Sequence, residues 1–458
     1  HYGDGNERPM KILLISPNTL RVPYPVYPIG LDYVAGAIAA RHEVRIADLN
    51  LLDRPALAGL LLDFAPDIIG LSIRNIDNTE AGAPLFFIEE FKELISWLRA
   101  RSRAVMVGGG AGFTILPKQI FTALELDYGI VGEGERFALL VEALDNEQAP
   151  DNIPGLISAS ALETVIKPWA GEQARHFGKT SANHHHFYLQ HGGMLNLQTK
   201  RGCAFRCSYC PYPHIEGHTH RLVPPDEVAR TALALQEAGA KYFFITDSAF
   251  NSDIGHSLAV AAAFRKVAIS IPWGGFFAPT RLPADYFQSM RAAGLQHVEF
   301  GTESLSATML RNYRKPFQPA DVLTAHNQAL AAGLHVAHYF LLGGPGESAQ
   351  TLDETIGALN SLPKTVFFFF TGIRIYPHTA LYDQALSENK ITADTDLLHP
   401  VFYESDAITH AAIEKIIVHQ AADRINWVVG SGGGKAAATV AKMHQRGYTG
   451  PLWEYLIR

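Results

Sequence analysis

The stretch Arg201-Gly202-Cys203-Ala204-Phe205-Arg206-Cys207-Ser208-Tyr209-Cys210 contains all three cysteines of this 458-residue chain. Their spacing is C-x-x-x-C-x-x-C, and no fourth cysteine exists to complete a set of four thiolates. Closed structural zinc sites have four protein ligands, so three thiolates with one open position favour an iron-sulfur cluster with one iron free for another ligand. The alternative, three unrelated thiols, requires all of them to fall by chance within one short segment.

The composition leaves room for large hydrophobic cores. Hydrophobic residues make up 47% of the chain, and its length suggests about three domains. No apolar run is long enough for a membrane span or a secretory signal. A formal charge of −7 without a long basic run gives no footprint for nucleic acid. Free cysteines in a cluster motif need reducing conditions, so we expect a cytoplasmic protein. The polar residues 1–9 carry no fold signal.

Residues 10–150 alternate between predicted strands and helices. This pattern predicts a doubly wound, Rossmann-like α/β domain, which binds ligands at the carboxyl ends of its parallel strands. The five predicted strands are Ile12–Ser16, Val44–Asp48, Ile68–Ile73, Ala104–Val107 and Tyr128–Val131. The glycine run Gly108–Gly112 follows the fourth strand, whereas a dinucleotide fingerprint follows the first. A tight turn with close backbone packing explains this run equally well.

A second series of strands and helices begins after a predicted linker at residues 151–193, where prolines and a polar run interrupt the alternation. The series occupies residues 194–382, and its first strand delivers the cysteines at its carboxyl end. The six predicted strands are Met194–Thr199, Tyr242–Thr246, Ser270–Trp273, His297–Gly301, His335–Leu342 and Val366–Ile375. Residues 383–458 are predicted to form a mainly helical tail.

The cysteine spacing, with Tyr209 directly before the last cysteine, resembles the signature of the radical S-adenosylmethionine (radical SAM) enzymes. The resemblance implies a partial (β/α)6 barrel and a [4Fe-4S] cluster on Cys203, Cys207 and Cys210, whose open iron binds S-adenosylmethionine. That cofactor is then cleaved to a 5′-deoxyadenosyl radical. On this basis Asp247 would hold the methionine end of the cofactor and Glu303 its ribose, although each could instead cap a helix. The remaining positions that match family motifs are Ser248, Ser304, Gly343–Glu347 and Tyr376.

The first 150 residues resemble, together with this motif, the cobalamin-binding domain that precedes many radical SAM enzymes. The resemblance implies that the glycine loop approaches the nucleotide tail of cobalamin. The loop after the first strand has no histidine, and His42 is predicted at the opposite edge of the sheet, so we expect no histidine on cobalt. Arg74 and Asn75 are candidates for its lower face, with a cap on the next helix as the alternative. The candidate cobalamin contacts are Asn18, Ser72, Arg74, Asn75, Gly108, Gly109, Gly110, Gly112, Phe113, Gly132 and Glu133.

His338, on the fifth predicted strand of the second series, is a candidate catalytic acid or base if it faces the barrel interior. A hydrogen-bonded core histidine is the alternative. Several aromatic and histidine side chains are candidates to line a substrate cavity and indicate an apolar or aromatic ligand, although such side chains also pack routinely. They are Tyr212, His214, His218, Trp273, Phe276 and Phe277.

Three functions follow from the resemblance. The first is a cobalamin-dependent radical SAM methyltransferase that methylates an unactivated carbon, or a phosphorus, of a small molecule through methylcobalamin and a 5′-deoxyadenosyl radical. The second is an enzyme with the same cofactors that cyclises, oxidises or rearranges its substrate. The third is a non-catalytic cobalamin or redox sensor. An enzyme of this kind would also need a reductant of the flavodoxin or ferredoxin type.

Overall fold

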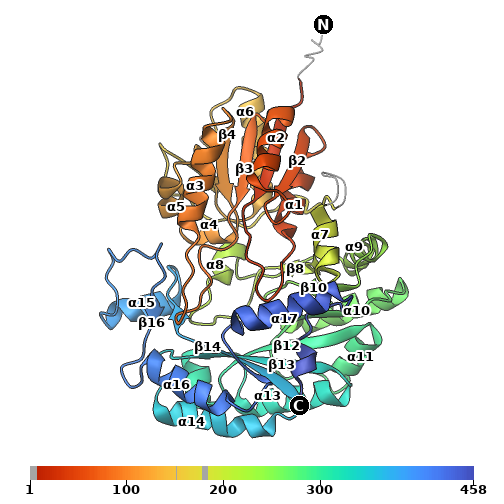
Figure 1. The fold of residues 1–458 in the computed structure, drawn as a ribbon, viewed down its shortest axis with the longest axis vertical. Coiled ribbons are helices and arrows are strands. Elements are labelled where there is room, and N and C mark those ends of the chain that lie inside the picture. The colour runs from red at the N-terminus through yellow and green to blue at the C-terminus, as the bar shows by residue number, and fades with distance from the viewer. Residues whose placement is uncertain (1–7, 151, 178–183) are drawn as a thin grey trace. The chain divides into compact units, whose positions relative to one another are not determined.

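The computed structural model describes residues 8–150, 152–177 and 184–458. Residues 1–7 of the polar N-terminal segment, and residues 151 and 178–183 of the predicted linker, lie outside the described residues. The described chain forms two units (Figure 1). The first comprises the residues up to Thr19 together with Pro28–Asp77 and Phe86–Phe187, and the second comprises Leu20–Tyr27, Asn78–Leu85 and Tyr188–Arg458.

The first unit is built on a sheet with the strand order β2-β1-β3-β4-β5-β6. The first five strands are parallel, whereas β6 runs antiparallel to β5. The order reverses direction between β1 and β3, and such a switch point is where open α/β sheets bind ligands. The strands are β1 (Lys11–Ser16), β2 (Glu43–Asp48), β3 (Ile68–Ser72), β4 (Val105–Gly109), β5 (Tyr128–Ile130) and β6 (Leu156–Ser158).

The helices of this unit connect its parallel strands. Residues from α1 and α6 pack with apolar side chains of the strands in one buried cluster. The helices are α1 (Ile29–Ile38), α2 (Arg54–Phe64), α3 (Ile88–Arg99), α4 (Ala111–Ile115), α5 (Pro117–Ala123), the 3₁₀ helix η1 (Gly134–Arg136) and α6 (Phe137–Asp145). The doubly wound fold and its five predicted strands are confirmed, with bounds that differ by a few residues. Sequence patterning missed β6, which lies in the predicted linker and is too short for a period to emerge.

The second unit is a seven-stranded parallel sheet in the order β17-β14-β13-β12-β11-β10-β7. Its edge strands β17 and β7 do not pair with each other, so the barrel is open. The strands are β7 (Met194–Leu197), β10 (Tyr242–Ile245), β11 (Trp273–Phe277), β12 (Leu295–Glu303), β13 (His335–Leu342), β14 (Thr365–Thr371) and β17 (Trp427–Val429). Two antiparallel pairs lie outside this sheet: β8 (Lys200–Arg201) with β9 (Arg221–Leu222), and β15 (Ile373–Arg374) with β16 (Phe402–Tyr403).

Helices cover the outer face of this sheet (Figure 1). The covering helices are α9 (Pro225–Glu237), α10 (Ile254–Lys266), α11 (Tyr286–Ala292), α12 (Ala307–Asn312), α13 (Pro319–Ala331), α14 (Ala349–Ala358) and α16 (His410–Ala421). The other helices that follow β7 are α8 (Tyr212–Glu216), α15 (Ala380–Ser387) and α17 (Gly433–Gln445). Helix α7 (His184–Gln190) precedes β7, and the 3₁₀ helices are η2 (Phe250–Ser252), η3 (Leu359–Ser361) and η4 (Trp453–Leu456).

Side chains alternate along a strand, so those of β13 and β14 point in turn to the outer core and to the barrel interior. Phe340, Leu342 and Phe367 pack in the outer core with apolar residues of α13, α14 and α16. Ala337 and Val366 are buried against Trp453, with Tyr339 and Phe368 packed against them. The barrel face that carries this second group is called the inner face below.

Six predicted strands correspond to strands of the second unit, and one of their bounds differs clearly from the prediction. The third strand begins at Trp273 and not at Ser270. The tail is mainly helical as predicted, and its residues Trp427–Val429 add the strand β17, which pairs in parallel with β14. A strand of three residues carries too little periodicity to be distinguished from a helix.

Candidate active site

The cysteine loop, Gly202–Cys210, is held at its start by backbone geometry. Gly202 has a φ of +84°, and a Cβ at this position would clash with the Thr219 carbonyl oxygen. Its N–H donates to the Glu216 carboxylate at 3.0 Å, and the Cys203 N–H donates to the Gly217 carbonyl at 3.0 Å. Only glycine fits this close approach, which fixes where the first cysteine leaves the strand.

The remainder of the loop is anchored to two distant segments. The Ser208 N–H donates to the Tyr313 carbonyl at 3.0 Å, and the Leu381 N–H donates to the Ser208 carbonyl at 2.8 Å. All three thiols are free; Cys203 is buried and the other two are partly buried. Burial raises the pKa of Cys207, and it raises the pKa of Cys210 to about 12. A bound metal centre or a nearby cation is therefore needed to stabilise these thiols as thiolates.

The donor set, three thiols on one anchored loop, is of the type that iron-sulfur clusters use. Among the described residues, no three histidine, cysteine or carboxylate side chains converge as a single metal ion requires. In an iron-sulfur cluster each cysteine binds a different iron, so the sulfurs lie further apart than around one ion. Three thiols on one anchored loop are compatible with that wider spacing.

A cation that the sequence analysis missed lies beside this loop. Lys315 Nζ is 3.3 Å from Glu303 Oε1 and 3.3 Å from the Tyr209 hydroxyl, which itself donates to Glu303 Oε1 at 2.8 Å. Burial alone would lower the pKa of Lys315, but Glu303 and the thiols of Cys207 and Cys210 raise it overall. Lys315 therefore stays charged and partly offsets the negative charge of thiolates. Nothing in its sequence context distinguishes it among the 38 Lys and Arg residues of the chain.

Glu303 occupies an unusual backbone position. Its φ is +64°, and the pairing of β12 with β13 shifts register between Gly301 and Glu303. A non-glycine residue with this φ is uncommon and is found most often where a side chain must be aimed. Here the irregularity directs the carboxylate toward Tyr209 of the cysteine loop. The structure thus brings Glu303 and Tyr209 together, while their contact with S-adenosylmethionine stays a prediction.

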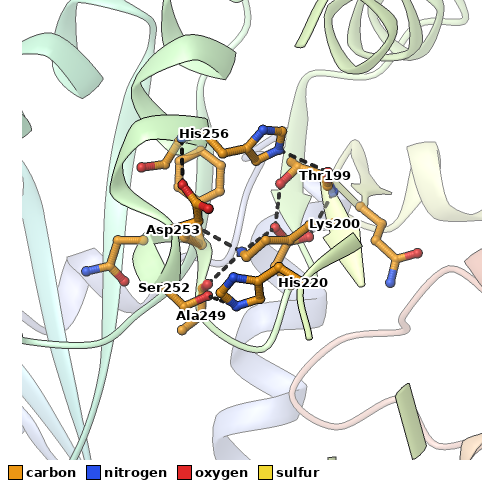
Figure 2. Close-up of polar contacts among 12 residues, drawn as sticks. Thr199, Lys200, His220, Ala249, Ser252, Asp253 and His256 are labelled. Atoms are coloured by element: carbon orange, nitrogen blue, oxygen red, sulfur yellow. Dashed lines mark hydrogen bonds and ion pairs between the residues drawn. The ribbon is translucent and has the colours of Figure 1, made fainter. Parts of the chain in front are cut away.

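Asp247 is also near the cysteine loop, but its carboxylate is buried and engaged. It is only 2% exposed, and its two oxygens accept hydrogen bonds from the Thr199 N–H, the Thr199 hydroxyl and Lys200 Nζ. Figure 2 shows Lys200 at the centre of the surrounding polar network. The role of Asp247 as a ligand of S-adenosylmethionine stays a prediction, and these contacts give it a different one that is argued below.

The other candidate S-adenosylmethionine residues differ in how available they are. The Ser248 hydroxyl is buried and has no hydrogen-bond partner within the described part of the chain. Ser304 is buried, and its hydroxyl bonds to the Thr355 hydroxyl at 3.0 Å and accepts the Ser306 N–H at 3.0 Å. Tyr376 is partly buried, with the Arg374 guanidinium 5.0 Å from its ring centre. Ser248 is therefore the most available hydroxyl of this set, and Ser304 contributes to packing.

His338 lies on the outer side of the sheet, away from the barrel interior. It is fully buried, its Nδ1 lies 2.7 Å from the Thr302 hydroxyl, and its Nε2 lies 3.0 Å from His326 Nδ1. His326 in turn contacts the Pro363 carbonyl at 3.0 Å. Burial holds the pKa of His338 well below its usual range. The structure thus corrects the candidate acid or base to the alternative, a core histidine with both ring nitrogens satisfied.

The inner face carries a continuous set of aromatic rings. The ring centre of Phe276 lies 5.0 Å from that of Phe244 and 6.4 Å from that of Tyr339. The Tyr339 ring stacks on Phe368 with 4.8 Å between the ring centres. Phe276 is 40% exposed, more than any other phenylalanine that the structure describes. Trp273 and Phe277 were predicted to line the cavity as well, and this prediction is wrong. Both are buried on the outer face of the sheet, against Phe250 and Phe287.

The remaining predicted lining residues follow the cysteine loop. Tyr212 and His214 lie in α8, where the Tyr212 hydroxyl donates to Glu216 at 3.2 Å. The His214 ring stacks on His378 at 4.1 Å, and burial lowers the pKa of His214 to about 4. His218 is in the turn that follows α8, and its place in a cavity stays a prediction.

In the first unit, the candidate cobalamin residues gather at the carboxyl edge of the sheet. Ser72 pairs in register with Gly109, and the Ile73 N–H donates to the Gly109 carbonyl at 2.7 Å. Asn18 follows β1, so it and Ser72 flank the switch point of the strand order. Arg74 Nε donates to the Asn75 side chain at 3.2 Å. The helix-cap alternative for Arg74 and Asn75 is wrong, because the next helix begins at Ile88 with Phe87 as its N-cap.

Several of these residues have clear packing roles. A Cβ on Gly110, whose φ is +108°, would lie 2.6 Å from the Ile73 carbonyl oxygen, and one on Gly112 would lie 2.8 Å from that of Arg74. A Cβ on Gly108 would clash with the Leu126 side chain, whereas one on Gly109 would have only ordinary contacts at 3.6 Å. Gly108, Gly110 and Gly112 therefore serve close packing within the unit.

The last candidates of the first unit are mostly buried. Phe113 is fully buried, and the Glu133 carboxylate accepts the Trp169 N–H at 2.5 Å. Gly132 has a φ of +87° and donates its N–H to the Thr114 hydroxyl at 2.9 Å. His42 directly precedes β2, at the opposite edge from the candidate residues, as the sequence predicted. Within the described residues 8–150, no histidine lies at the candidate edge.

Family models match a segment in each of the two units of the chain. Residues 197–359 match the model of the radical SAM superfamily, and residues 15–141 match that of the B12 binding domain. The tryptophan 2-C-methyltransferase of Streptomyces laurentii is 24% identical, covering 81% of this chain and 73% of its own. The cytidylyl-2-hydroxyethylphosphonate methyltransferase of Streptomyces wedmorensis is also 24% identical, covering 76% of each chain.

A solved structure shares the fold over nearly the whole chain. The radical S-adenosylmethionine methyltransferase TsrM of Kitasatospora setae superposes with a TM-score of 0.87 at 21% identity, covering 98% of both chains. Among the described residues, no helix has the length and apolar character that crossing a bilayer requires.

Proposed function

Because the chain belongs to the radical SAM superfamily and carries a B12-binding domain, we propose that it is a cobalamin-dependent methyltransferase acting on an unactivated carbon, or a phosphorus, of a small molecule. The cofactors of this family are a [4Fe-4S] cluster, S-adenosylmethionine and cobalamin. The observation that carries the proposal is the presence, in one chain, of a three-cysteine loop and a segment, residues 15–141, that matches the B12 binding domain. Relatives with methyltransferase activity support it.

In this proposal the side chains of the second unit hold and charge-balance the cluster. Cys203, Cys207 and Cys210 are its ligands, and Lys315 offsets part of the thiolate charge. The Glu303 carboxylate contacts Tyr209 of the cysteine loop, and in this proposal it accepts hydrogen bonds from the ribose hydroxyls of S-adenosylmethionine. When bound, the cofactors supply a radical that removes a hydrogen from the substrate and a methyl group that replaces it.

The inner face supports a substrate with a flat apolar or aromatic portion. Phe276 exposes an aromatic ring beside Phe244 and Tyr339, and exposed apolar surface of this kind is typical of a ligand-binding groove. Aromatic rings favour stacked or edge-on partners. Phe276→Ala is therefore expected to raise the KM for such a substrate.

The working environment follows from the cofactors. A [4Fe-4S] cluster must be reduced before it can cleave S-adenosylmethionine, so the proposal includes a protein reductant of the flavodoxin or ferredoxin type. Free thiols and a cluster persist under reducing conditions, which supports a cytoplasmic location as part of the proposal.

The test is anaerobic turnover of reconstituted protein with methyl-deuterated S-adenosylmethionine, a reductant and a panel of aromatic metabolites. We expect 5′-deoxyadenosine and S-adenosylhomocysteine in comparable amounts, with a product that carries one labelled methyl group. Substrate consumption with 5′-deoxyadenosine but no label would replace methyl transfer by cyclisation, oxidation or rearrangement. Binding of both cofactors without either product, across substrates and reductants, would favour a sensor.

A further inference from the structure

A fully buried ion pair lies directly before the cysteine loop. Lys200 and Asp247 have side chains that are each 1% exposed, and Lys200 Nζ is 3.0 Å from Asp247 Oδ2. Lys200 Nζ also donates to the carbonyl oxygens of Ala249 at 2.7 Å and Phe250 at 3.1 Å. An ammonium group has three hydrogens, so all of its donors are used within the protein (Figure 2).

Asp247 is bound just as completely. Its Oδ1 accepts the Thr199 N–H at 2.8 Å, and its Oδ2 accepts the Thr199 hydroxyl at 2.5 Å in addition to Lys200. The Thr199 carbonyl contacts His256 Nε2 of α10 at 3.1 Å. A carboxylate with both oxygens occupied and almost no exposed surface has little capacity to bind the ammonium group of S-adenosylmethionine directly.

These contacts join two segments that meet at the site. Only Arg201 and Gly202 separate Lys200 from Cys203, the first cysteine of the loop. The partners of Lys200, which are Asp247, Ala249 and Phe250, belong to the segment after β10. A buried charge left without its partner is strongly unfavourable, so the pair holds the start of the cysteine loop against this segment.

We propose that Lys200 and Asp247 are positioning residues that hold the cysteine loop in its cluster-binding conformation, and that Asp247 does not itself contact S-adenosylmethionine. The inference rests on the assignment of the cluster to the three cysteines, and it holds whether or not the enzyme transfers a methyl group. It replaces the role that the family motif implied for Asp247.

The experiment compares anaerobically reconstituted Asp247→Asn and Lys200→Met with wild type, measuring iron loss to a chelator, the electron paramagnetic resonance spectrum of the reduced cluster, and S-adenosylmethionine affinity per cluster. Mutation of a group that orients a metal ligand typically lowers metal affinity about 10- to 100-fold. We expect iron to be lost at least about 10-fold faster and the cluster spectrum to change, with S-adenosylmethionine affinity per remaining cluster unchanged. The double variant should lose iron no faster than the worse single variant.

Two further variants separate positioning from general destabilisation. Asp32→Asn breaks an equally buried ion pair with Arg175 in the first unit, where the side chains are 0% and 6% exposed, and it should leave iron retention unchanged. Thr199→Val removes one hydrogen bond to Asp247 without unpairing a charge, and it should speed iron loss by a smaller factor even if the charge variants fail to fold. Normal iron retention with at least about 10-fold weaker S-adenosylmethionine binding in Asp247→Asn would overturn the proposal, as would iron loss in Asp32→Asn.

Discussion

The two candidate cofactor edges differ in what forms them. At the cysteine loop of the second unit, charged side chains are paired with one another: Lys315 with Glu303, and Lys200 with Asp247. At the carboxyl edge of the first unit, five of the eleven candidates are glycines, and three of these glycines are already required by packing. The site at the cysteine loop can therefore be tested by removing single charges. The glycine run of the first unit is tested by adding a Cβ to single glycines.

The largest effect is expected at the cysteines. Alanine at Cys203, Cys207 or Cys210 should abolish the [4Fe-4S] cluster, because the chain has three cysteines in total and no spare thiol. Iron and sulfide analysis after anaerobic reconstitution measures this loss, with Ser208→Ala in the same loop as the control. A normal cluster content in any of the three cysteine variants would remove the basis for the whole site.

The next largest effect is expected at Glu303. Glu303→Gln keeps the side-chain shape but removes the charge that pairs with Lys315, so S-adenosylmethionine affinity should fall about 10- to 100-fold, or roughly 1.5 to 3 kcal/mol. Equilibrium binding with cluster-loaded protein measures the change, and cobalamin content should stay constant. Unchanged affinity would restrict Glu303 to a structural role with Tyr209 and Lys315.

The sequence could predict the cysteine-loop edge only where side chains form a motif. The cysteine spacing, Tyr209 and Glu303 could be placed because the family signature fixes them along the chain. Lys315 could not, since a shift in strand register and the turn after α12 bring it to Glu303. His338 was uncertain because β13 alternates, and a pattern alone does not say which face is the interior.

The edge of the first unit was predictable as a fold and much less as a site. Five strands followed from periodicity, and their parallel order places all the candidate loops at one edge. Which glycines pack against Ile73 and Arg74, and which remain available to a ligand, depends on distances that no local pattern encodes.

The pH dependence of stability tests whether His338 and His326 form a buried, uncharged pair in the core. Burial lowers the pKa of His326 to about 4, below the value of about 6.5 expected in the unfolded chain. The unfolded state therefore binds more protons below about pH 6.5, so stability should be complete above that pH and decrease toward pH 4 by up to about 1.4 kcal/mol per pH unit. Melting temperatures from pH 7.5 to 5 should fall less steeply in His326→Gln. Equal slopes would mean that His326 takes up a proton as readily in the folded protein as in the unfolded chain.

A matched pair of glycine variants separates packing from ligand approach at the edge of the first unit. Gly110→Ala places a Cβ 2.6 Å from a carbonyl oxygen at a positive φ, and should destabilise the protein by about 1 to 3 kcal/mol. Gly109→Ala adds a Cβ with ordinary contacts at 3.6 Å and should leave the melting temperature unchanged. If the backbone at Gly109 approaches cobalamin, this variant should still bind it more weakly. Normal cobalamin binding in Gly109→Ala would leave the glycine run with packing as its explanation.

The smallest expected effect concerns Arg74, a charged side chain among the candidates at the edge of the first unit. Arg74 follows β3 at the switch point and caps no helix, so its guanidinium remains the candidate group for the lower face of cobalt. Arg74→Ala should change the electron paramagnetic resonance spectrum of bound cob(II)alamin while leaving iron content unaltered. Neither protein should show nitrogen hyperfine splitting from an imidazole, because His42 lies at the opposite edge of the sheet. An unchanged spectrum in Arg74→Ala would remove Arg74 from the candidates for the lower face of cobalt, and imidazole splitting in either protein would require a histidine from elsewhere in the chain.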